Sequence, residues 1–449
     1  MAAVRAGQYG LKVGVVEKAP RLGGVCLHVG CIPTKALLYS ADVYELFQHP
    51  EEHGISCENV RLDWSRVQAR KNKIVLKHSK GLEFLFKKHK IETIAGHARL
   101  KGKGRVEVEG PDGRREIETR HIILATGSEA RMLPGVAADP ERILTNIEIL
   151  DLKSVPRSLA IIGAGAVGVE FASIFRRFGS EVTILEMLPR LTPLEDEEIS
   201  AELERAFKKQ GIATHTGAKV ESVEKRTDCV AVAFRDSAGE LRNICSEKLL
   251  VAVGRKPNTE NIGLENTAIK TDRGFIPVDR WMATAEPGVY AIGDIVAASP
   301  QLAHTASMEG LVAVAHIAGK PARPLNYRSN PNCTYCEPQI ASVGLTEARA
   351  RDEGYKVKAG KFGFAANSKA SILGQHGGFV KVVADEKYGE ILGVHIIGPS
   401  ATELIAEAVT AMEAEATVES MMYTIHAHPT LSEAMGEAFN AVYGLSINA

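Results

Sequence analysis

Two cysteines near the start of the chain could form a redox pair. Cys26 and Cys31 lie in the run GGVCLHVGCIPTKALL, at residues 23–38, and a helical pattern continues through Lys35. This spacing can close a small disulfide loop at the first turn of a helix. A helix N-terminus lowers the pKa of a thiol, so we expect a thiolate near neutral pH. A dithiol with one exposed and one inner sulfur is the arrangement that thiol–disulfide exchange needs. The alternative, two unrelated buried cysteines in a glycine-rich loop, stays open on spacing alone.

A histidine near the opposite end of the chain could supply proton transfer. The run HAHPTLSEA, at residues 426–434, contains His426, His428 and Glu433. A histidine titrates near neutral pH, and a carboxylate on its second nitrogen fixes the tautomer and stabilises the imidazolium. Cysteine-based catalysis requires a base of this kind. We expect Pro429 to direct the His428 ring away from its own helix, and His426 to pack or hydrogen-bond locally.

A glycine motif in the middle of the chain predicts a dinucleotide site. Gly163, Gly165 and Gly168 form G-x-G-x-x-G between an apolar strand and the helical run GVEFASIFRRFG. Such glycines permit a tight turn, a close approach of backbone to pyrophosphate, and close packing of helix on strand. The helix N-terminus then faces the phosphates. The next strand ends at Glu186, an acid that would bind the adenosine ribose and repel a 2′-phosphate, which favours NAD over NADP. The alternative is a glycine-rich turn without a ligand. We expect the same site to include Ala166, Val167, Val220 and Gly254.

The elements that must position these residues alternate between short apolar runs and helical patterns. This alternation is typical of α/β architecture. Buried strands are expected at residues 13–18, 122–128, 159–165, 181–186 and 249–255. A different pattern begins near Pro331, where strands at 379–385 and 391–398 precede a helix at 401–415. Strands followed by a helix predict an α+β domain there.

Composition limits the class of protein. A length of 449 residues predicts roughly three domains. The hydrophobic fraction of 45% and charged fraction of 24% fit a soluble globular protein. A formal net charge of −1 gives no reason to expect nucleic acid or an anionic membrane as partner. No apolar stretch is long enough to span a bilayer, and the start lacks the pattern of a secretory signal. The basic run at 71–90 predicts an amphipathic surface helix.

The remaining cysteines and acids have plainer interpretations. Cys333 and Cys336 form a CxxC within an expected strand, whose alternating faces oppose a disulfide, and no second pair supports zinc or another metal. Cys57, Cys229 and Cys245 are interpreted as scattered thiols in the core or at the surface. Seven cysteines are an odd and sparse set, which fits a cytoplasmic protein with one special pair. The acidic run at 194–200 predicts a solvated helix start.

The cysteine run GGxCLxxGCIPTK resembles the redox signature of the pyridine nucleotide–disulfide oxidoreductases. The resemblance extends over nearly the whole chain and includes ATGS (125–128), YAIGDIV (290–296), QLAHTA (301–306) and HAHPTLSEA in the expected order. It implies two doubly wound dinucleotide-binding domains, for FAD and NAD, and an α+β dimerisation domain. The expected bounds are 1–150 and 266–330 for the FAD domain, 151–265 for the NAD domain and 331–449 for the dimerisation domain.

The resemblance also implies a role for each site residue. Cys26 and Cys31 would be the redox-active disulfide, His428 the acid/base, and Glu433 the carboxylate that orients His428. The histidine would enter the active site of a neighbouring subunit, which implies a homodimer. The residues implied to bind FAD, with Glu170 as the partner of Lys35, are Glu17, Lys35, Gly96, Ala98, Thr126, Gly127, Ser128, Asp294, Ala303 and His304.

Within the family, the sequence is most similar to the dihydrolipoamide dehydrogenases. This similarity implies oxidation of dihydrolipoamide by NAD⁺, on the lipoyl domain of an E2-type acyltransferase in a 2-oxo acid dehydrogenase or glycine cleavage complex. Glutathione reductase is disfavoured because Glu186 is wrong for NADP. Mercuric reductase carries a further cysteine pair near its C-terminus, whereas the tail NAVYGLSINA has none.

Two departures from the family pattern stand out. The family opens with a strand and its own G-x-G-x-x-G for FAD, but this sequence opens in the helix that follows, at MAAVRAGQYG. We expect that the recorded start is too late. The alternative is a truncated, flavin-free homologue that acts as a binding partner. His28 replaces a common asparagine between the two cysteines without removing a known role.

Overall fold

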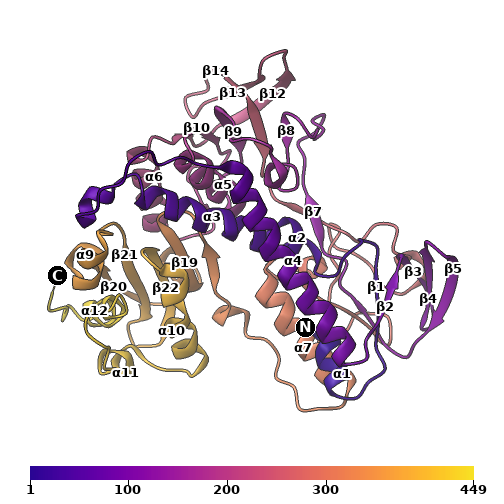
Figure 1. Cartoon of the computed structure of the whole chain (residues 1–449). Helices are drawn as coiled ribbons and strands as arrows, with labels where there is room; N and C mark the ends of the chain where they lie inside the picture. Colours follow the sequence, from indigo (N-terminus) through magenta and orange to yellow (C-terminus); the bar gives the residue numbers. More distant parts are fainter. Residues whose placement is uncertain (449) are drawn as a thin grey trace. The chain divides into compact units, whose positions relative to one another are not determined.

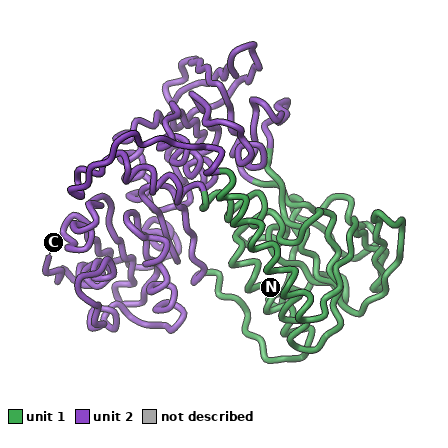
Figure 2. The backbone as a smooth tube through the Cα atoms, in the orientation of Figure 1, with its two compact units in different colours: residues 1–36, 68–131, 255–327 green, residues 37–67, 132–254, 328–449 purple. Residues whose placement is uncertain are grey.

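The computed structural model describes residues 1–448, which form two compact units (Figure 2). Unit 1 comprises residues 1–36, 68–131 and 255–327, and unit 2 comprises residues 37–67, 132–254 and 328–449. Three elements run from one unit into the other: α3 (Cys31–Leu46), α4 (Trp64–Lys88) and the 3-10 helix η5 (Tyr327–Ser329). Each unit is described by itself.

The described residues of unit 1 form four small sheets. Two are parallel strand pairs, β1 with β2 and β17 with β6. The third is the antiparallel meander β3-β4-β5, and β16 pairs with β7 in a short antiparallel ladder. The strands are β1 (Gly14–Glu17), β2 (Glu92–Ala95), β3 (His97–Gly102), β4 (Arg105–Gly110), β5 (Gly113–Glu118), β6 (Ile122–Leu124), β7 (Ser128–Ala130), β16 (Arg255–Pro257) and β17 (Val289–Ala291).

The helices of unit 1 include the first one of the chain. They are α1 (Ala2–Gln8), α2 (Gly24–Val29) and α7 (Ala303–Ile317), with the 3-10 helices η3 (Leu264–Asn266) and η4 (Gly293–Ile295). The predicted surface helix at 71–90 is confirmed as part of α4. The predicted strand at 13–18 is found as β1, but the expectation that it is buried is wrong. Its residues are exposed or half-buried because β1 has only β2 as a hydrogen-bonded neighbour.

The nucleotide-type region of unit 2 is built on a five-stranded parallel sheet of order β11-β10-β9-β15-β8 (Figure 1). Its strands and those of the adjoining meander are β8 (Ile143–Leu144), β9 (Ser158–Ile162), β10 (Glu181–Leu185), β11 (Ala213–His215), β12 (Lys219–Lys225), β13 (Val230–Arg235), β14 (Leu241–Ser246) and β15 (Lys248–Val251). The helices are η1 (Pro50–His53), η2 (Ile149–Asp151), α5 (Ala166–Arg177) and α6 (Glu197–Lys209). The predicted strands β9, β10 and β15 are confirmed, and their apolar runs are buried, as strands inside a parallel sheet should be.

The C-terminal region of unit 2 is an antiparallel sheet of order β18-β19-β22-β21-β20, covered by helices (Figure 1). Its strands are β18 (Asn332–Thr334), β19 (Gln339–Gly344), β20 (Val357–Gly363), β21 (Phe379–Asp385) and β22 (Ile391–Gly398). Its helices are α8 (Glu347–Asp352), η6 (Phe364–Ala366), α9 (Ser368–Leu373), α10 (Ala401–Glu413), α11 (Val418–Met422) and α12 (Glu433–Ala441). The predicted α/β class with a C-terminal α+β region is confirmed.

No helix among residues 1–448 is both long and apolar enough to cross a membrane. Within the same residues, no group of three or more His, Cys, Asp or Glu side chains could hold a metal ion.

A buried ammonium joins the two regions of unit 2. Lys381 on β21 lies 3.0 Å from Asp196, 2.8 Å from Glu198 and 2.9 Å from Glu347, and its side chain is only 4% exposed. Asp196 also caps α6, since its side chain accepts a hydrogen bond from the Glu198 N–H. We call Lys381 and these three carboxylates the Lys381 cluster. It links the first turn of α6 to the C-terminal sheet.

The Lys381 cluster corrects one expectation from the sequence. The run at 194–200 was expected to be solvated, but Glu195 and Asp196 are buried. Burial alone would raise the pKa of Asp196, but the nearby His395 and Lys381 lower it. The pKa of Glu347 is lowered by hydrogen bonds from Arg351 and then Lys381. The charge that stabilises this helix start is therefore paired with an ammonium instead of facing water.

We predict that Lys381→Met lowers the free energy of unfolding by about 3–5 kcal/mol, because it leaves buried carboxylates without their counter-charge. The carboxylates have lowered pKa values, so their stabilising effect is present above the ordinary pKa of about 4 and is lost as the pH falls through the lower, folded value. The difference between the two proteins should therefore shrink below about pH 4. Denaturant unfolding across pH measures it.

The matched control is Arg205→Met, on α6, which removes the ion pair that the exposed Arg205 makes with Glu202. It should change the free energy of unfolding by less than about 1 kcal/mol. Equal effects of the two substitutions would contradict a special role for the buried cluster.

Candidate functional site

The glycine turn of the nucleotide-type region requires its glycines for two different reasons. At Gly168, an added Cβ would lie 1.9 Å from the Gly163 carbonyl oxygen, so a side chain would push the helix off the strand. Gly163 has φ +103°, and its Cβ would lie 2.4 Å from the carbonyl oxygen of Ala252, beyond β15. Gly165, by contrast, faces open space and caps α5. The turn thus presents accessible backbone at its middle glycine and at Ala166, where a phosphate could approach.

Glu186 lies directly after β10 and holds the glycine turn in place. One carboxylate oxygen accepts a hydrogen bond of 2.6 Å from the Ala164 N–H, and the other accepts one of 2.8 Å from the Leu188 N–H. Each oxygen keeps a second lone pair, so the carboxylate can still accept hydrogen bonds from ribose hydroxyls. Among the other residues predicted here, Val220 lies on β12 and Gly254 follows β15. The sequence-predicted nucleotide residues therefore come together in unit 2.

The cysteine pair lies at the junction of two helices. Cys26 belongs to α2, and Cys31 is the first residue of α3. The two side chains are in hydrogen-bonding contact and are both free thiols in this structure. The expected position at a helix start is therefore present for Cys31.

The pKa of the Cys26 thiol is raised, while the expected thiolate at the helix start stays a prediction. The hydrogen bond with Cys31 raises the pKa of Cys26, burial raises it further, and the charge of Lys35 opposes both effects only in part. Two adjacent thiols compete for charge, because a negative charge on one disfavours a negative charge on the other. The contact with Cys31 and burial therefore raise the pKa of Cys26 by more than the charge of Lys35 lowers it.

An arginine that the sequence reasoning missed joins the ATGS turn to Asp294. The Arg255 guanidinium donates hydrogen bonds of 2.6 Å to the side chain and to the backbone carbonyl of Ser128. The Ser128 hydroxyl in turn donates to Asp294, which forms an ion pair with Arg255 at 3.8 Å. Burial lowers the pKa of Arg255, whereas Asp294 and Cys31 raise it, so the guanidinium also lies within electrostatic reach of the cysteine pair. A lone Arg after a strand carries no sequence signal for this role.

The rest of the ATGS turn is fixed by the loop after β16. The Thr126 hydroxyl donates to the Asn258 carbonyl at 2.6 Å, and the Asn258 side chain donates back to the Thr126 carbonyl. Gly127 has φ +69°, with nothing within 4 Å of where a Cβ would lie. The turn is therefore held at its edges and open at its centre.

Five further residues of the predicted flavin site lie at or near the ends of elements in unit 1. Glu17 ends β1, and its backbone carbonyl accepts from the Gly96 N–H at 3.0 Å. Ala98 lies on β3. Ala303 and His304 are exposed in the first turn of α7.

Glu309 is a buried acid that the sequence reasoning also missed. It lies on α7 and accepts hydrogen bonds of 2.6 Å from the Gly293 N–H, 2.5 Å from the Ser299 hydroxyl and 2.8 Å from the Tyr327 hydroxyl. It thereby fixes the residue next to Asp294. Its sequence signal was a single acid in a helix whose other interior residues are small or apolar.

The predicted acid–base pair is in direct contact in unit 2. His428 Nδ1 lies 2.8 Å from Glu433 Oε1, and the second Glu433 oxygen accepts from the Thr430 N–H at 2.8 Å. Burial would raise the pKa of Glu433, but the Thr430 N–H and His428 lower it. The contact on Nδ1 leaves Nε2 of the exposed ring for exchange with a substrate. His426 makes a separate 2.8 Å contact with Glu407, consistent with the local role expected for it.

One predicted pairing spans both units. Lys35 lies on α3 in unit 1, and Glu170 lies on α5 in unit 2, so their contact stays a prediction. Within unit 2, Glu170 accepts a 2.9 Å hydrogen bond from the Tyr335 N–H, which the sequence did not suggest.

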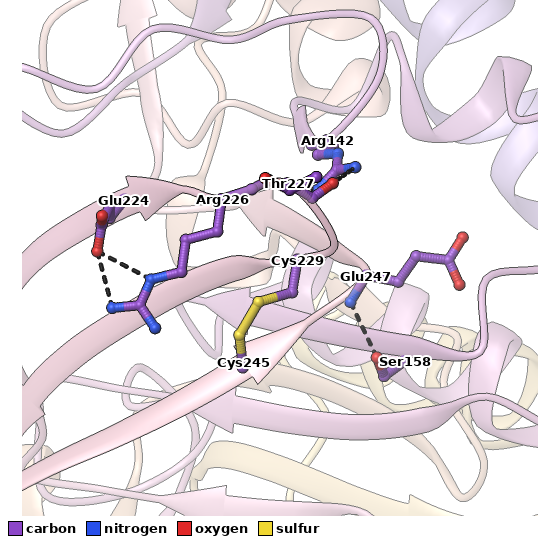
Figure 3. Close-up of a disulfide and its surroundings, with 8 residues drawn as sticks. All are labelled: Arg142, Ser158, Glu224, Arg226, Thr227, Cys229, Cys245 and Glu247. Carbon is purple, nitrogen blue, oxygen red and sulfur yellow. Dashed lines mark hydrogen bonds and ion pairs between the residues drawn. A yellow bond between two sulfur atoms is a disulfide. The ribbon is translucent and has the colours of Figure 1, made fainter.

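The other cysteines divide into two outcomes. Cys333 and Cys336 carry thiols and are not joined by a disulfide. Cys229 and Cys245 form a disulfide, so their interpretation as scattered thiols is wrong (Figure 3). The two cysteines meet because β13 pairs with β14. The positions of the cysteines in the sequence do not reveal which strands become neighbours.

Two protein-family models match most of the chain. Residues 1–310 match the model of the pyridine nucleotide-disulphide oxidoreductases, and residues 330–439 match that of the dimerisation domain of the same group.

The chain belongs to the pyridine nucleotide–disulphide oxidoreductase family.

Full-length relatives of this oxidoreductase share much of its sequence. The dihydrolipoyl dehydrogenase of Bacillus subtilis is 45% identical over 459 residues, covering 100% of this chain and 96% of that protein. That of Chlorobaculum tepidum is 44% identical, covering 99% of this chain and 95% of that protein.

Solved structures support the same placement. LpdA from Mycobacterium tuberculosis superposes with a TM-score of 0.89 at 27% identity, over 98% of this chain and 96% of that one. The HOCl-induced flavoprotein disulfide reductase RclA from Escherichia coli superposes with a TM-score of 0.86 at 27% identity, with the same coverage. The sequence-based family assignment is therefore confirmed.

The residues of unit 1 fit part of a flavin. The Ser128–Asp294–Arg255 network, the open Gly127 turn and the exposed start of α7 offer polar groups in one unit. The single G-x-G-x-x-G of the sequence lies in unit 2, so the described residues of unit 1 offer no glycine turn of that type for a pyrophosphate.

We predict opposite outcomes for two glycine substitutions in the nucleotide turn. Gly168→Ala should destabilise the protein by about 1–3 kcal/mol, because its Cβ would collide with the backbone of Gly163. Gly165→Ala should cost less than about 1 kcal/mol, because its Cβ would enter open space. Thermal unfolding of the two variants measures the difference. A Gly165→Ala variant as unstable as Gly168→Ala would contradict this account of the turn.

Proposed function

We propose that the protein is a dihydrolipoyl dehydrogenase, which oxidises protein-bound dihydrolipoamide to lipoamide and reduces NAD⁺. The observation that carries the proposal is the contact between the thiols of Cys26 and Cys31, with Cys31 at a helix start. Lys35 and Arg255 place positive charge near this pair. The full-length similarity to dihydrolipoyl dehydrogenases supports the choice of substrate.

Dithiol oxidation at the cysteine pair begins from its disulfide form. A thiolate of the substrate attacks the Cys26 sulfur, the bond to Cys31 breaks, and Cys31 leaves as a thiolate. The second substrate thiol then attacks the sulfur bound to Cys26, which closes the lipoamide ring and releases the Cys26 thiol. The two electrons lost by the substrate now reside on the cysteine pair, the dithiol state seen in this structure.

His428 takes the proton that the attacking thiol must lose. Its Nε2 would accept this proton, while Glu433 holds Nδ1 and stabilises the resulting imidazolium. In the homodimer that we propose, His428 of one protomer serves the cysteine pair of its partner. The match of residues 330–439 to a dimerisation domain supports this assembly.

FAD would supply the two-electron chemistry that connects the dithiol with the nicotinamide. We assign its binding to Glu17, Gly96, Ala98, the ATGS turn, Asp294, Ala303 and His304, with Lys35 near the ring and Glu170 as the partner of Lys35. NAD would bind at the glycine turn of unit 2, where Gly165 and Ala166 approach its phosphates and Val167, Val220 and Gly254 line the site. Glu186 would accept the ribose hydroxyls and repel a 2′-phosphate.

The lipoyl domain of an E2-type acyltransferase, in a 2-oxo acid dehydrogenase or glycine cleavage complex, is the proposed partner. We also propose a cytoplasmic location. The proposed domains are an FAD domain at 1–150 and 266–330, an NAD domain at 151–265 and a dimerisation domain at 331–449. A flavin-free homologue that acts as a binding partner is the second candidate.

We predict that the purified chain, after incubation with FAD, forms NADH from dihydrolipoamide and NAD⁺, with NADP⁺ a much weaker acceptor. Near-ultraviolet absorbance of the reduced nucleotide follows the reaction. Cys31→Ser should abolish it, because the disulfide can no longer form, while Cys57→Ser should leave it unchanged. A protein that takes up no FAD would favour the flavin-free candidate. A flavoprotein that reacts with nicotinamides but not with dihydrolipoamide would keep the family and contradict the substrate.

We predict that His428→Gln lowers kcat for dihydrolipoamide oxidation by roughly 10²- to 10⁴-fold, the usual range for removing a general base. Glu433→Gln should lower kcat by less, because the base remains and only its orientation is lost. NADH oxidation by an artificial one-electron acceptor should persist in both variants, since no substrate thiol is deprotonated. Glu419→Gln, an exposed change on α11, is the control. Equal losses in both assays would indicate a structural role instead.

A further inference from the structure

A disulfide far along the chain from Cys26 and Cys31 lies on the meander of unit 2. Cys229 precedes β13 and Cys245 lies on β14 (Figure 3). Because Ala231 pairs with Cys245, Cys229 occupies the diagonal position on the same face of the two strands. Their Cα atoms are 5.8 Å apart, within the range that a disulfide bridges. The pairing of the strands therefore brings the two thiols together.

The bond is open to reagents from solution. Cys245 is exposed and Cys229 is half-buried. A recess of about 350 Å³ lies beside the bond. It is lined by Arg157, Ser158, Glu181, Asp228, Glu247 and the two cysteines. Cys245 is the more exposed residue of the two, so we expect an attacking thiolate to reach its sulfur first.

The charges around this recess are mostly negative. Three carboxylates and one guanidinium line it, and Arg157 already lies 3.6 Å from Glu247. Of the two neighbouring arginines, Arg226 is neutralised by a carboxylate, whereas Arg142 keeps its positive charge, so three carboxylates of the lining face two guanidinium groups, those of Arg157 and Arg142. Arg226 forms an ion pair with Glu224, and Arg142 donates to the backbone carbonyls of residues 226 and 227 (Figure 3). The recess should therefore repel anionic reagents.

We propose that Cys229–Cys245 is a second thiol–disulfide exchange site, separate from the Cys26–Cys31 pair, which accepts electrons from small uncharged dithiols. The proposal goes beyond the function proposed above and does not depend on it. If that function holds, dihydrolipoamide is itself a reductant of the required class.

The exchange balances without a further reactant. One thiol of the dithiol loses its proton to solvent, and the thiolate attacks Cys245. The bond between the two cysteines breaks, and Cys229 leaves as a thiolate that takes up a proton. The second thiol of the reagent then loses its proton and attacks the reagent sulfur bound to Cys245. The reagent closes to a cyclic disulfide, and Cys245 is released as a thiolate that takes up the second proton.

Two features favour a dithiol over glutathione. Ring closure makes the second step intramolecular, whereas glutathione needs a second molecule. Glutathione also carries net negative charge, which the carboxylates of the recess oppose. The site thus selects by both the number of thiols and the charge of the reagent.

Reduction would remove the cross-link between β14 and the residue before β13, next to the five-stranded parallel sheet. Cys245 lies on β14, which continues through Glu247 into β15, the strand between β9 and β8. The Glu247 N–H is held by the Ser158 hydroxyl at 2.9 Å, so this connection keeps one anchor after reduction. We therefore expect faster local opening of β13 and β14, and no unfolding of the parallel sheet.

The test incubates the full-length protein, purified without reductant, with dithiothreitol or with glutathione at equal thiol concentration under anaerobic conditions. Free thiols are then alkylated and located by peptide mass spectrometry. The peptides of Cys229 and Cys245 should be alkylated at least about tenfold faster with dithiothreitol. Cys57, an exposed free thiol, reports that alkylation itself is equal in both samples. Hydrogen exchange of β13 and β14 should rise on reduction and stay unchanged in a Cys229→Ser/Cys245→Ser variant treated in the same way.

Two double substitutions test whether the carboxylates of the recess slow the reaction with glutathione. Asp228→Asn/Glu247→Gln removes two carboxylates of the recess and should speed the reaction with glutathione by about threefold or more at low salt, with less effect near 1 M salt. Glu221→Gln/Glu240→Gln, on the same meander but outside the recess lining, leaves the Arg226–Glu224 ion pair intact and should not. Three results would each overturn the proposal. Cys229 and Cys245 could be unbonded in the protein as purified, or the disulfide could react at equal rates with both reagents. The bond could also resist dithiothreitol while Cys26 and Cys31 are fully reduced.

Discussion

The first turn of α6 depends on one buried ammonium. Lys381 comes from the C-terminal sheet, and the carboxylates that surround it come from the nucleotide region and from α8. Without it, three acids would lie close together around a helix start with too little water to solvate them. With it, the nucleotide region is tied by ion pairs to the sheet of the C-terminal region, and both belong to unit 2. An interaction of this kind fixes position more than it adds stability, because the desolvation of the charges offsets much of their attraction.

The two cysteine pairs differ in their electrostatic surroundings. Cys26 and Cys31 lie near Lys35 and Arg255, which stabilise a negative sulfur. The pair on the meander lies among carboxylates, which destabilise one. The proposed redox pair and the disulfide on the meander therefore differ in the sign of the charge around their sulfur atoms.

Local patterns in the sequence predicted most of the elements and many contacts of the site. The glycine turn, Glu186 after β10 and the His428–Glu433 contact all involve short segments whose geometry follows from glycine, strand and helix-start rules. The misses involve residues distant in sequence. Ser128 and Arg255 are 127 positions apart, and Asp196 and Lys381 are 185 apart. No periodicity encodes such pairs, because each depends on which strands become neighbours. The same holds for Cys229 and Cys245, whose meeting requires the register of β13 on β14.

A single substitution of Glu186 would affect both the structure of the glycine turn and the proposed binding of the ribose. Its oxygens hold the N–H groups of Ala164 and Leu188, and the proposed function assigns the ribose hydroxyls to the same carboxylate. Replacing it with a basic residue, the obvious route toward a phosphorylated coenzyme, would also leave two backbone amides without their acceptor. Engineering of coenzyme choice in this scaffold would therefore have to supply a neutral acceptor for the turn before it supplied a positive charge for the phosphate.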